Sequence, residues 1–164
     1  YLITLPAGKD YAFNVNRKNY LFYSDNFSLA NDIADSFFTK DIPMKPIEPG
    51  ATVILKNIFY KTGSYSLDSS SFSELDKLFL LMNENPGMKI QIAGHTDNAG
   101  KKDSNLSLSM NRAKSVVSYL TSKGIAAIRL QAKGFGDTAP IASNDTEQGK
   151  SLNRRTEINI ISNQ

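Results

Sequence analysis

From residue 51 onward the apolar side chains change their spacing several times, and this order of patterns restricts the fold more than any other feature of the chain. Residues 52–60 are β-rich and apolar on both faces, as expected for a covered strand. Apolar and polar residues alternate over residues 88–92 and again over residues 128–132, which is typical of strands. Residues 154–161 are expected to form the closing strand.

Two segments between these strands have the spacing of amphipathic helices. Ser71 and Glu74 have the spacing of a capping box, which predicts the start of the first helix. The second helix is expected to run from Ser109, as its N-cap, to Lys123, with Gly124 just past its end. The order β-α-β-α-β-β predicts an α+β domain with the helices packed on one face of a mixed sheet.

A short β-rich segment precedes this domain. Tyr11, Phe13 and Val15 alternate with other residues on one expected strand, and residues 20–23 are expected to form another after a hairpin loop. These strands are too few to close a core alone. We therefore expect them to be the last strands of a β-rich module that lies mostly upstream.

A connector rich in proline separates the two parts. Within residues 26–50, Leu29, Ile33 and Phe37 have helical spacing, and an extended linker with three prolines follows. We therefore predict a β-rich end of an upstream module plus linker over residues 1–46, and one domain over residues 47–164. Because the chain begins with tyrosine and not with methionine, we expect it to be a fragment whose targeting signals lie elsewhere.

Composition excludes several classes of protein. The chain has 164 residues, no cysteine and one histidine, so disulfides, thiolate catalysis and zinc ribbons are impossible, and neither a metal site nor a cofactor is expected. The 19 basic and 16 acidic side chains are scattered, whereas nucleic-acid-binding domains carry denser basic stripes. The longest apolar run, residues 78–82, is far too short to span a membrane.

The residues whose side chains are best suited to bind a ligand lie around the expected end of the strand over residues 88–92. Gly94 allows the backbone to be approached closely, Asp97 supplies a carboxylate, and Arg112 supplies a guanidinium fork near the start of the following helix. Open sheets bind ligands at such strand-to-helix crossings. Asp97 and Arg112 could hold a ligand together, or they could form an internal salt bridge that braces the loop against the helix.

Two neighbouring arginines open the closing strand. The alternation of that strand places Arg154 on the face that later carries isoleucines, and it directs Arg155 toward the opposite face. A partly buried arginine needs an anion or a carbonyl as its partner. We expect Arg154 to have such a partner and Arg155 to point outward.

These residues together form a recognisable set of motifs. The chain carries Gly94-His95-Thr96-Asp97, then Asn105, Leu108-Ser109 and Arg112-Ala113, and finally Asn153-Arg154-Arg155. Over about residues 50–162 it resembles the peptidoglycan-binding domain of the OmpA/MotB/Pal family. More weakly, the β-rich start and the proline-containing linker resemble large multidomain outer-membrane lipoproteins of the Bacteroidetes type, in which such a domain ends the chain.

The resemblance implies non-covalent binding of peptidoglycan through the diaminopimelate of its stem peptide. The family's aspartate and arginine, which receive the ammonium and carboxylate of that residue, match Asp97 and Arg112. Four further residues match supporting positions: Thr96, Asn105, Leu108 and Arg154. The implied function is to anchor an outer-membrane protein complex, such as a secretion system, to the cell wall in the periplasm, without catalysis and without a cofactor.

One departure from the family and two alternatives remain open. Many members have an aspartate after two aromatic residues on the first strand, whereas here Lys61 follows Phe59 and Tyr60. Lys61 either faces solvent or changes how the ligand is bound, and Tyr60 belongs either to the core or to a pocket wall. The alternative function is a peptidoglycan hydrolase that uses His95 with Asp97, although the chain lacks a Gly-x-Ser-x-Gly nucleophile turn.

Overall fold

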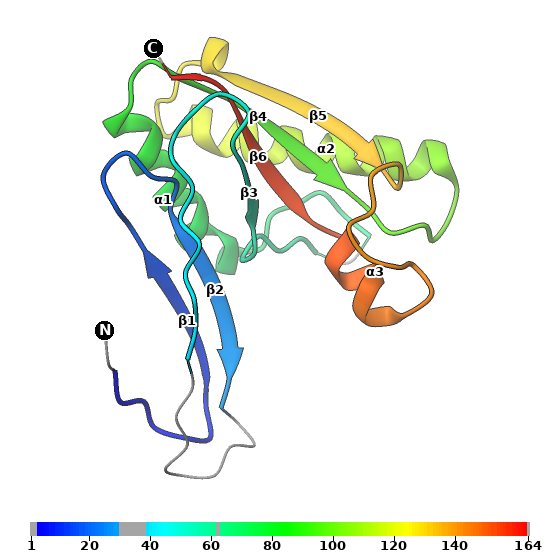
Figure 1. The fold of residues 1–164 in the computed structure, drawn as a ribbon. Helices are drawn as coiled ribbons and strands as arrows, with labels where there is room; N and C mark the ends of the chain where they lie inside the picture. The colour runs from blue at the N-terminus through cyan, green and yellow to red at the C-terminus, as the bar shows by residue number, and fades with distance from the viewer. Residues whose placement is uncertain (1–2, 30–38, 62, 164) are drawn as a thin grey trace.

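The computed structural model describes residues 3–29, 39–61 and 63–163, which form two sheets and three α-helices (Figure 1). The first sheet is a hairpin of β1 (Asp10–Val15) and β2 (Tyr23–Ser28). The second sheet contains β3 (Thr52–Leu55), β4 (Met88–His95), β5 (Leu130–Gly136) and β6 (Thr156–Asn163). The helices are α1 (Phe72–Glu84), α2 (Lys102–Ser122) and α3 (Glu147–Asn153).

The four-stranded sheet is mixed, as predicted. Its order is β3-β6-β4-β5, in which β4 is parallel to β5 and antiparallel to β6, and β3 is antiparallel to β6. Helices α1 and α2 pack on one face, while α3 lies near the end where β6 begins (Figure 1). The predicted α+β fold is therefore confirmed, and its core is built from α1, α2 and the inward faces of the strands, including Leu75, Leu78, Ile90, Ile92, Val116, Leu120 and Ile158.

Two glycines let α2 lie directly on the sheet. A Cβ atom on Gly94 would stand 2.2 Å from the carbonyl oxygen of Ser109, and one on Gly134 would stand 2.5 Å from the backbone nitrogen of Met110. The hydroxyl of Ser109 accepts a hydrogen bond from the backbone N–H of Gly136 at 2.9 Å. The close approach expected at Gly94 therefore serves helix packing, and it fixes α2 over β4 and β5.

The predicted start of the second helix is wrong. Helix α2 begins at Lys102, about two turns earlier, and Ser109 is a fully buried residue in its interior rather than its N-cap. The first turns present Asn105 and Ser109 to the sheet, and these small polar residues give no apolar stripe in the sequence. The predicted end is close, since Gly124 follows the helix with a positive φ of 107°.

The first helix begins where expected, but not through a capping box. The hydroxyl of Ser71 bonds to the backbone of Phe59, accepting from its N–H at 2.7 Å and donating to its carbonyl at 2.9 Å. Glu74 is buried and accepts a hydrogen bond from the hydroxyl of Ser24 at 2.8 Å. Because Ser71 bonds to Phe59 and Glu74 bonds to Ser24, the two hydrogen bonds of a capping box are not formed.

Three strand boundaries also differ from the predictions. The first strand of the domain ends at Leu55 instead of residue 60, and the third begins at Leu130 because Ala127–Arg129 forms a 3-10 turn. The closing strand begins at Thr156, after helix α3, which the sequence analysis did not predict.

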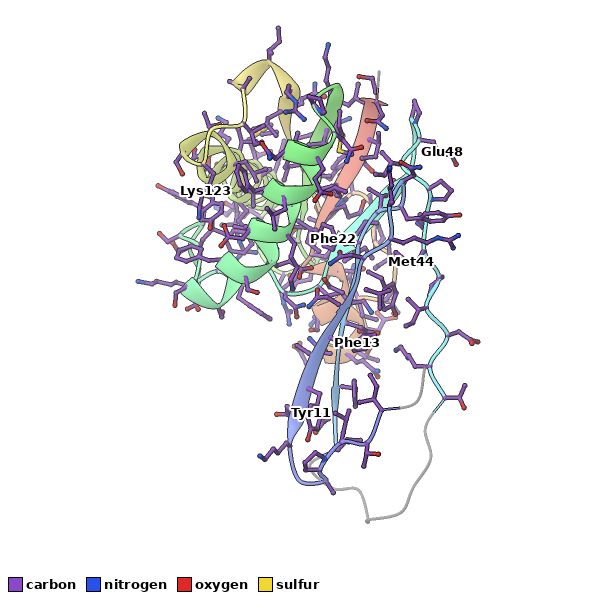
Figure 2. All side chains as sticks on the ribbon, turned by 90° about the vertical axis from the view of Figure 1, so that its left-hand side faces the viewer. Tyr11, Phe13, Phe22, Met44, Glu48 and Lys123 are labelled. Carbon is purple, nitrogen blue, oxygen red and sulfur yellow. The ribbon has the colours of Figure 1, made fainter. Side chains whose placement is uncertain are left out.

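The amino-terminal hairpin is an arm that packs at its base against the domain. The strand expected at 11–15 is present in β1, whereas β2 begins only at Tyr23. Leu21 and Phe22, just before β2, are 1% and 3% exposed and belong to the same core as α1. Figure 2 shows Phe22 between the hairpin and α1. The helical spacing noted over residues 29–37 falls mainly on residues 30–38, which lie outside the described part of the chain.

The boundary between residues 46 and 47 stays a prediction, and a truncation tests it. Residues 47–164 alone should unfold cooperatively, because the four-stranded sheet and its helices contribute most of the core. The melting temperature should nevertheless fall, because the truncation uncovers the surface that Leu21 and Phe22 occupy. Thermal unfolding followed by circular dichroism measures both effects. An insoluble or non-cooperatively unfolding fragment would show that the hairpin is part of the domain.

A second prediction concerns the contact beneath α2. Gly94→Ala should destabilise the domain by about 3 kcal/mol, the upper end for overpacked sites, because a backbone atom of α2 blocks the new methyl group. Denaturant unfolding of the variant measures this loss. An unchanged midpoint would mean that α2 does not rest on Gly94.

Candidate functional site

The candidate site is the loop that joins β4 to α2, together with the start of β6. The backbone N–H of Thr96 donates to the carbonyl of Gly136 at 2.9 Å, and its hydroxyl donates to the carbonyl of Asp97 at 2.8 Å. The side-chain amide of Asn105, on α2, donates to the carbonyls of Asp97 and Ala99 at 3.3 and 3.0 Å. Thr96 and Asn105 are buried, and both determine the shape of the loop.

Asp97 is held at the centre of this loop. One oxygen of its carboxylate accepts from the backbone N–H of Ala99 at 3.0 Å, and the other pairs with a terminal nitrogen of Arg154 at 2.6 Å. Burial alone would raise the pKa of Asp97, but the hydrogen bonds from Arg154 and Ala99 outweigh it and hold the pKa below its usual value. Asp97 is therefore the anionic partner that was expected for Arg154.

Arg112 is held by neutral groups instead of by Asp97. Its Nε donates to the carbonyl of Ser64 at 3.2 Å, and its guanidinium lies 4.8 Å from the centroid of the Tyr60 ring. In residues 3–29, 39–61 and 63–163, no carboxylate lies within 4 Å of this guanidinium. Burial lowers the pKa of Arg112 from its usual value, which reflects the cost of removing the cation from water. The internal Asp97–Arg112 salt bridge, one of the two alternatives, is thus not formed.

Tyr60 links the elements that carry the two site arginines. Its hydroxyl donates to the backbone carbonyl of Arg112 on α2 at 3.3 Å and lies 3.1 Å from the hydroxyl of Thr156 at the start of β6. Thr156 follows Arg154 by two residues. Tyr60 is partly buried, and its ring lies against the guanidinium of Arg112.

Leu108 lies on α2, one turn before Arg112. It is half-buried and lines a shallow depression of about 460 Å³, whose lining does not include Asp97, Arg112 or Arg154. The other residues around this depression come from the loop after Tyr60 and from α2: Gly63, Tyr65, Asp103, Ser104, Ser107 and Asn111. Lys61 is exposed and therefore faces solvent, which is one of the two alternatives given above. Its charge helps to lower the pKa of Asp68.

The charges of the site suit a ligand with both an anionic and a cationic group. Asp97 pairs with Arg154 and interacts electrostatically with Arg112. The exposed Glu147 also lies 4.0 Å from Arg154, so Arg112 is the site arginine that has no carboxylate within 4 Å among the described residues. A ligand carboxylate can satisfy a guanidinium fork, and a ligand ammonium can approach Asp97. Among the described residues no group of three or more histidine or acidic side chains could hold a metal ion, and no helix there is long and apolar enough to span a membrane.

His95 belongs to a separate cluster and not to a dyad with Asp97. Its ring stacks on Phe135 with centroids 4.9 Å apart, and its Nε2 lies 3.7 Å from a carboxylate oxygen of Glu157. Arg155 donates to Glu157 at 2.6 Å and to the carbonyl of Ala139 at 3.1 Å. The arrangement thus gives no support to a hydrolase built on His95 and Asp97.

The expected outward orientation of Arg155 is wrong. Its side chain is only 7% exposed, because the partly buried carboxylate of Glu157 and a loop carbonyl attract the guanidinium. Glu157 in turn responds to this environment: His95 and then Arg155 lower its pKa to about 2, against the opposing effect of burial.

Sequence reasoning missed the structural part played by Asn153. This residue is completely buried, and its side-chain oxygen Oδ1 accepts from the backbone N–H groups of Ile141 and Ala142 at 2.8 and 3.1 Å. Its amide nitrogen donates to the side chain of Asn144 at 2.9 Å. Asn153 therefore fixes the 141–144 loop next to Arg154, and its place in the Asn-Arg-Arg motif was the available signal.

Comparisons with known proteins show the family to which this chain belongs. The model of the OmpA family matches residues 59–154. The chain is 36% identical over 114 residues to "Probable lipoprotein YiaD" of Escherichia coli, covering 68% of this chain and 52% of that protein. It is 38% identical over 93 residues to the peptidoglycan-binding protein ArfA of Mycobacterium tuberculosis, covering 57% of this chain and 28% of that protein.

A solved structure supports the same assignment. The cell wall anchor of the T6SS from Pseudomonas aeruginosa superimposes with a TM-score of 0.59 at 28% identity, covering 68% of this chain and 79% of that one. The chain belongs to the OmpA family. It spans about half of the length of the first relative above and about a quarter of the second.

The cluster around Glu157 makes the stability of the domain dependent on pH. Because the folded-state pKa of Glu157 is about 2, below its ordinary 4.5, its ionised form stabilises the fold above pH 4.5, and this contribution is lost as the pH falls toward 2. Glu157→Gln should therefore be less stable at neutral pH and should lose less stability than the wild type between pH 4.5 and 2. Denaturant unfolding across this range measures the difference. Parallel curves for the two proteins would contradict the assignment.

Proposed function

We propose that this domain binds peptidoglycan non-covalently through the diaminopimelate of the stem peptide. The observation that carries the proposal is the guanidinium of Arg112, which is held by neutral groups and is close enough to the Asp97–Arg154 pair to interact electrostatically with both charges. The free end of diaminopimelate bears an ammonium and a carboxylate on one carbon. Asp97 receives the ammonium and Arg112 receives the carboxylate in this proposal, while Arg154 borders both groups.

The supporting residues act mainly on the shape of the site. Thr96 and Asn105 hold the loop that presents Asp97, and Leu108, one turn before Arg112 on α2, supplies an apolar side chain. Two similar proteins, a peptidoglycan-binding protein and a cell wall anchor, support this choice of ligand.

The proposed role is that of an anchor and not of an enzyme. The domain holds an outer-membrane protein complex, such as a secretion system, to the wall on the periplasmic side. A polymeric wall offers many identical sites, so modest affinity at each site is sufficient when several copies of the domain are linked. Two similar proteins, one named a probable lipoprotein and the other a cell wall anchor, support this location at the outer membrane and the wall.

Two substitutions test the ligand contacts. Asp97→Ala and Arg112→Ala should each lower affinity for purified peptidoglycan by roughly two to three orders of magnitude, because each leaves a desolvated ligand charge without its partner, at a cost of about 3–5 kcal/mol. Arg112→Lys should also bind weakly, since an ammonium lacks the planar fork. Sedimentation with peptidoglycan measures binding.

The matched control is Lys114→Ala, which removes one positive charge from an exposed position of the same helix. It should bind like the wild type. Thermal melting of the same samples separates lost binding from lost folding, and the supernatant should contain no soluble muropeptides. Unchanged affinity in both alanine variants would overturn the proposed site, and release of muropeptides would favour the hydrolase.

A further inference from the structure

Two neutral groups form a cradle around the Arg112 guanidinium: the Tyr60 ring, 4.8 Å away, and the Ser64 carbonyl, 3.2 Å from Nε. Arg112 is partly buried, and a buried arginine usually pairs with a carboxylate. A neutral cradle orients the fork without cancelling its charge. Within the described residues only Nε has a hydrogen-bond partner, so the two terminal nitrogens keep their donors for a ligand.

Backbone hydrogen bonds flank the cradle. The backbone N–H of Ser64 donates to the carbonyl of Lys61 at 2.9 Å, and the N–H of Lys61 donates to the carbonyl of Ser66 at 3.1 Å. Tyr60 and Leu67 form an antiparallel bridge beside these hydrogen bonds. The Ser64 carbonyl and the Tyr60 ring thus contact the same guanidinium.

Tyr60 also connects the supports of the two site arginines. Its hydroxyl joins the backbone of Arg112 on α2 to Thr156 on β6, and Thr156 is two residues from Arg154. Thr156 is 2% exposed, so this junction lies inside the protein. One side chain thus influences both the direction of the Arg112 fork and the spacing between the elements that carry Arg112 and Arg154.

We propose that Tyr60 is a positioning residue that determines specificity: it holds Arg112 as an oriented, uncompensated guanidinium, so that the site distinguishes a free ligand carboxylate from its amide. This inference rests on the proposed function. A carboxylate accepts two parallel hydrogen bonds from a guanidinium, whereas a carboxamide offers one oxygen and an NH₂ group that faces a donor. The distinction requires a fork held in one direction, because a mobile guanidinium can turn to meet the single oxygen.

The experiment compares two stem peptides that differ at one group. In one the free end of diaminopimelate is a carboxylate, and in the other it is the carboxamide. The full chain should bind the carboxylate peptide roughly tenfold or more tightly, as expected for hydrogen bonds to a charged group. Tyr60→Leu should reduce this preference to about twofold, mainly by weakening the carboxylate peptide. Tyr60→Phe keeps the ring and should retain most of the preference. Calorimetric titration measures all six affinities, those of the three proteins for the two peptides.

The outcomes separate this inference from the proposed function. If Arg112→Ala abolishes binding while Tyr60→Leu keeps the full preference, the inference is wrong and the proposed site stands. If Tyr60→Leu weakens both peptides in the same proportion, Tyr60 has only a structural role and the inference is also wrong. If Arg112→Ala binds both peptides like the wild type, the proposed function fails and the inference fails with it.

A spectroscopic measurement covers the case in which Tyr60→Leu does not fold. The Nε–H of Arg112 donates to the Ser64 carbonyl, so its side-chain signal in a ¹⁵N NMR spectrum should be resolved and slow to exchange with water in the wild type and in Tyr60→Phe. Arg112→Lys identifies the signal by its absence. A fast-exchanging Arg112 signal in the wild type would overturn the inference, because the fork would then not be held.

Discussion

The contact between α2 and the sheet at Gly94 and Gly134 is the constraint on which the rest of the site depends. With no Cβ atom at either position, the backbone of α2 around Ser109 lies directly against β4 and β5. Asn105 then reaches the loop that follows β4, and Arg112 reaches the turn that follows Tyr60. A larger residue at either glycine would push away the helix that carries both side chains.

The two site arginines differ in exposure and in the partners that hold them, and this difference determines how each can respond to a ligand. Asp97 is paired with Arg154, whose side chain is 41% exposed, whereas Arg112 is more enclosed and has only neutral partners. An exposed arginine exchanges partners at little cost, because water replaces the lost contact. A ligand ammonium can therefore compete with Arg154 for Asp97, while the enclosed Arg112 gains a partner that it lacked.

Sequence reasoning succeeded where a signal is local or is carried by a motif. The strand that begins at Met88, the glycine after α2 and the order of the elements other than α3 follow from period and turn chemistry. It failed where tertiary contacts decide. Ser109 has the composition of an N-cap but is buried against Gly136, and Arg155 has the parity of an exposed residue but pairs with Glu157. Gly136 is 27 positions from Ser109, too far for a local pattern to show the contact. Glu157 is only two positions from Arg155, but the alternation of the strand does not show that this face of β6 is covered.

The pairing of Asp97 with Arg154 is the most instructive of these failures, because the sequence named both residues but not their contact. They are separated by 57 positions, and only the antiparallel register of β4 and β6, which aligns Gly94 with Thr156, brings them together. On the other side of β6, Thr156 is aligned with Leu55 of β3, and its hydroxyl lies 3.1 Å from that of Tyr60. Sheet pairing thus sets the distance between the charges of the site, and a shift of one residue along β6 would turn the side chains that follow Arg154 to the opposite face. The chemistry of this loop is therefore a property of the sheet as much as of the motif.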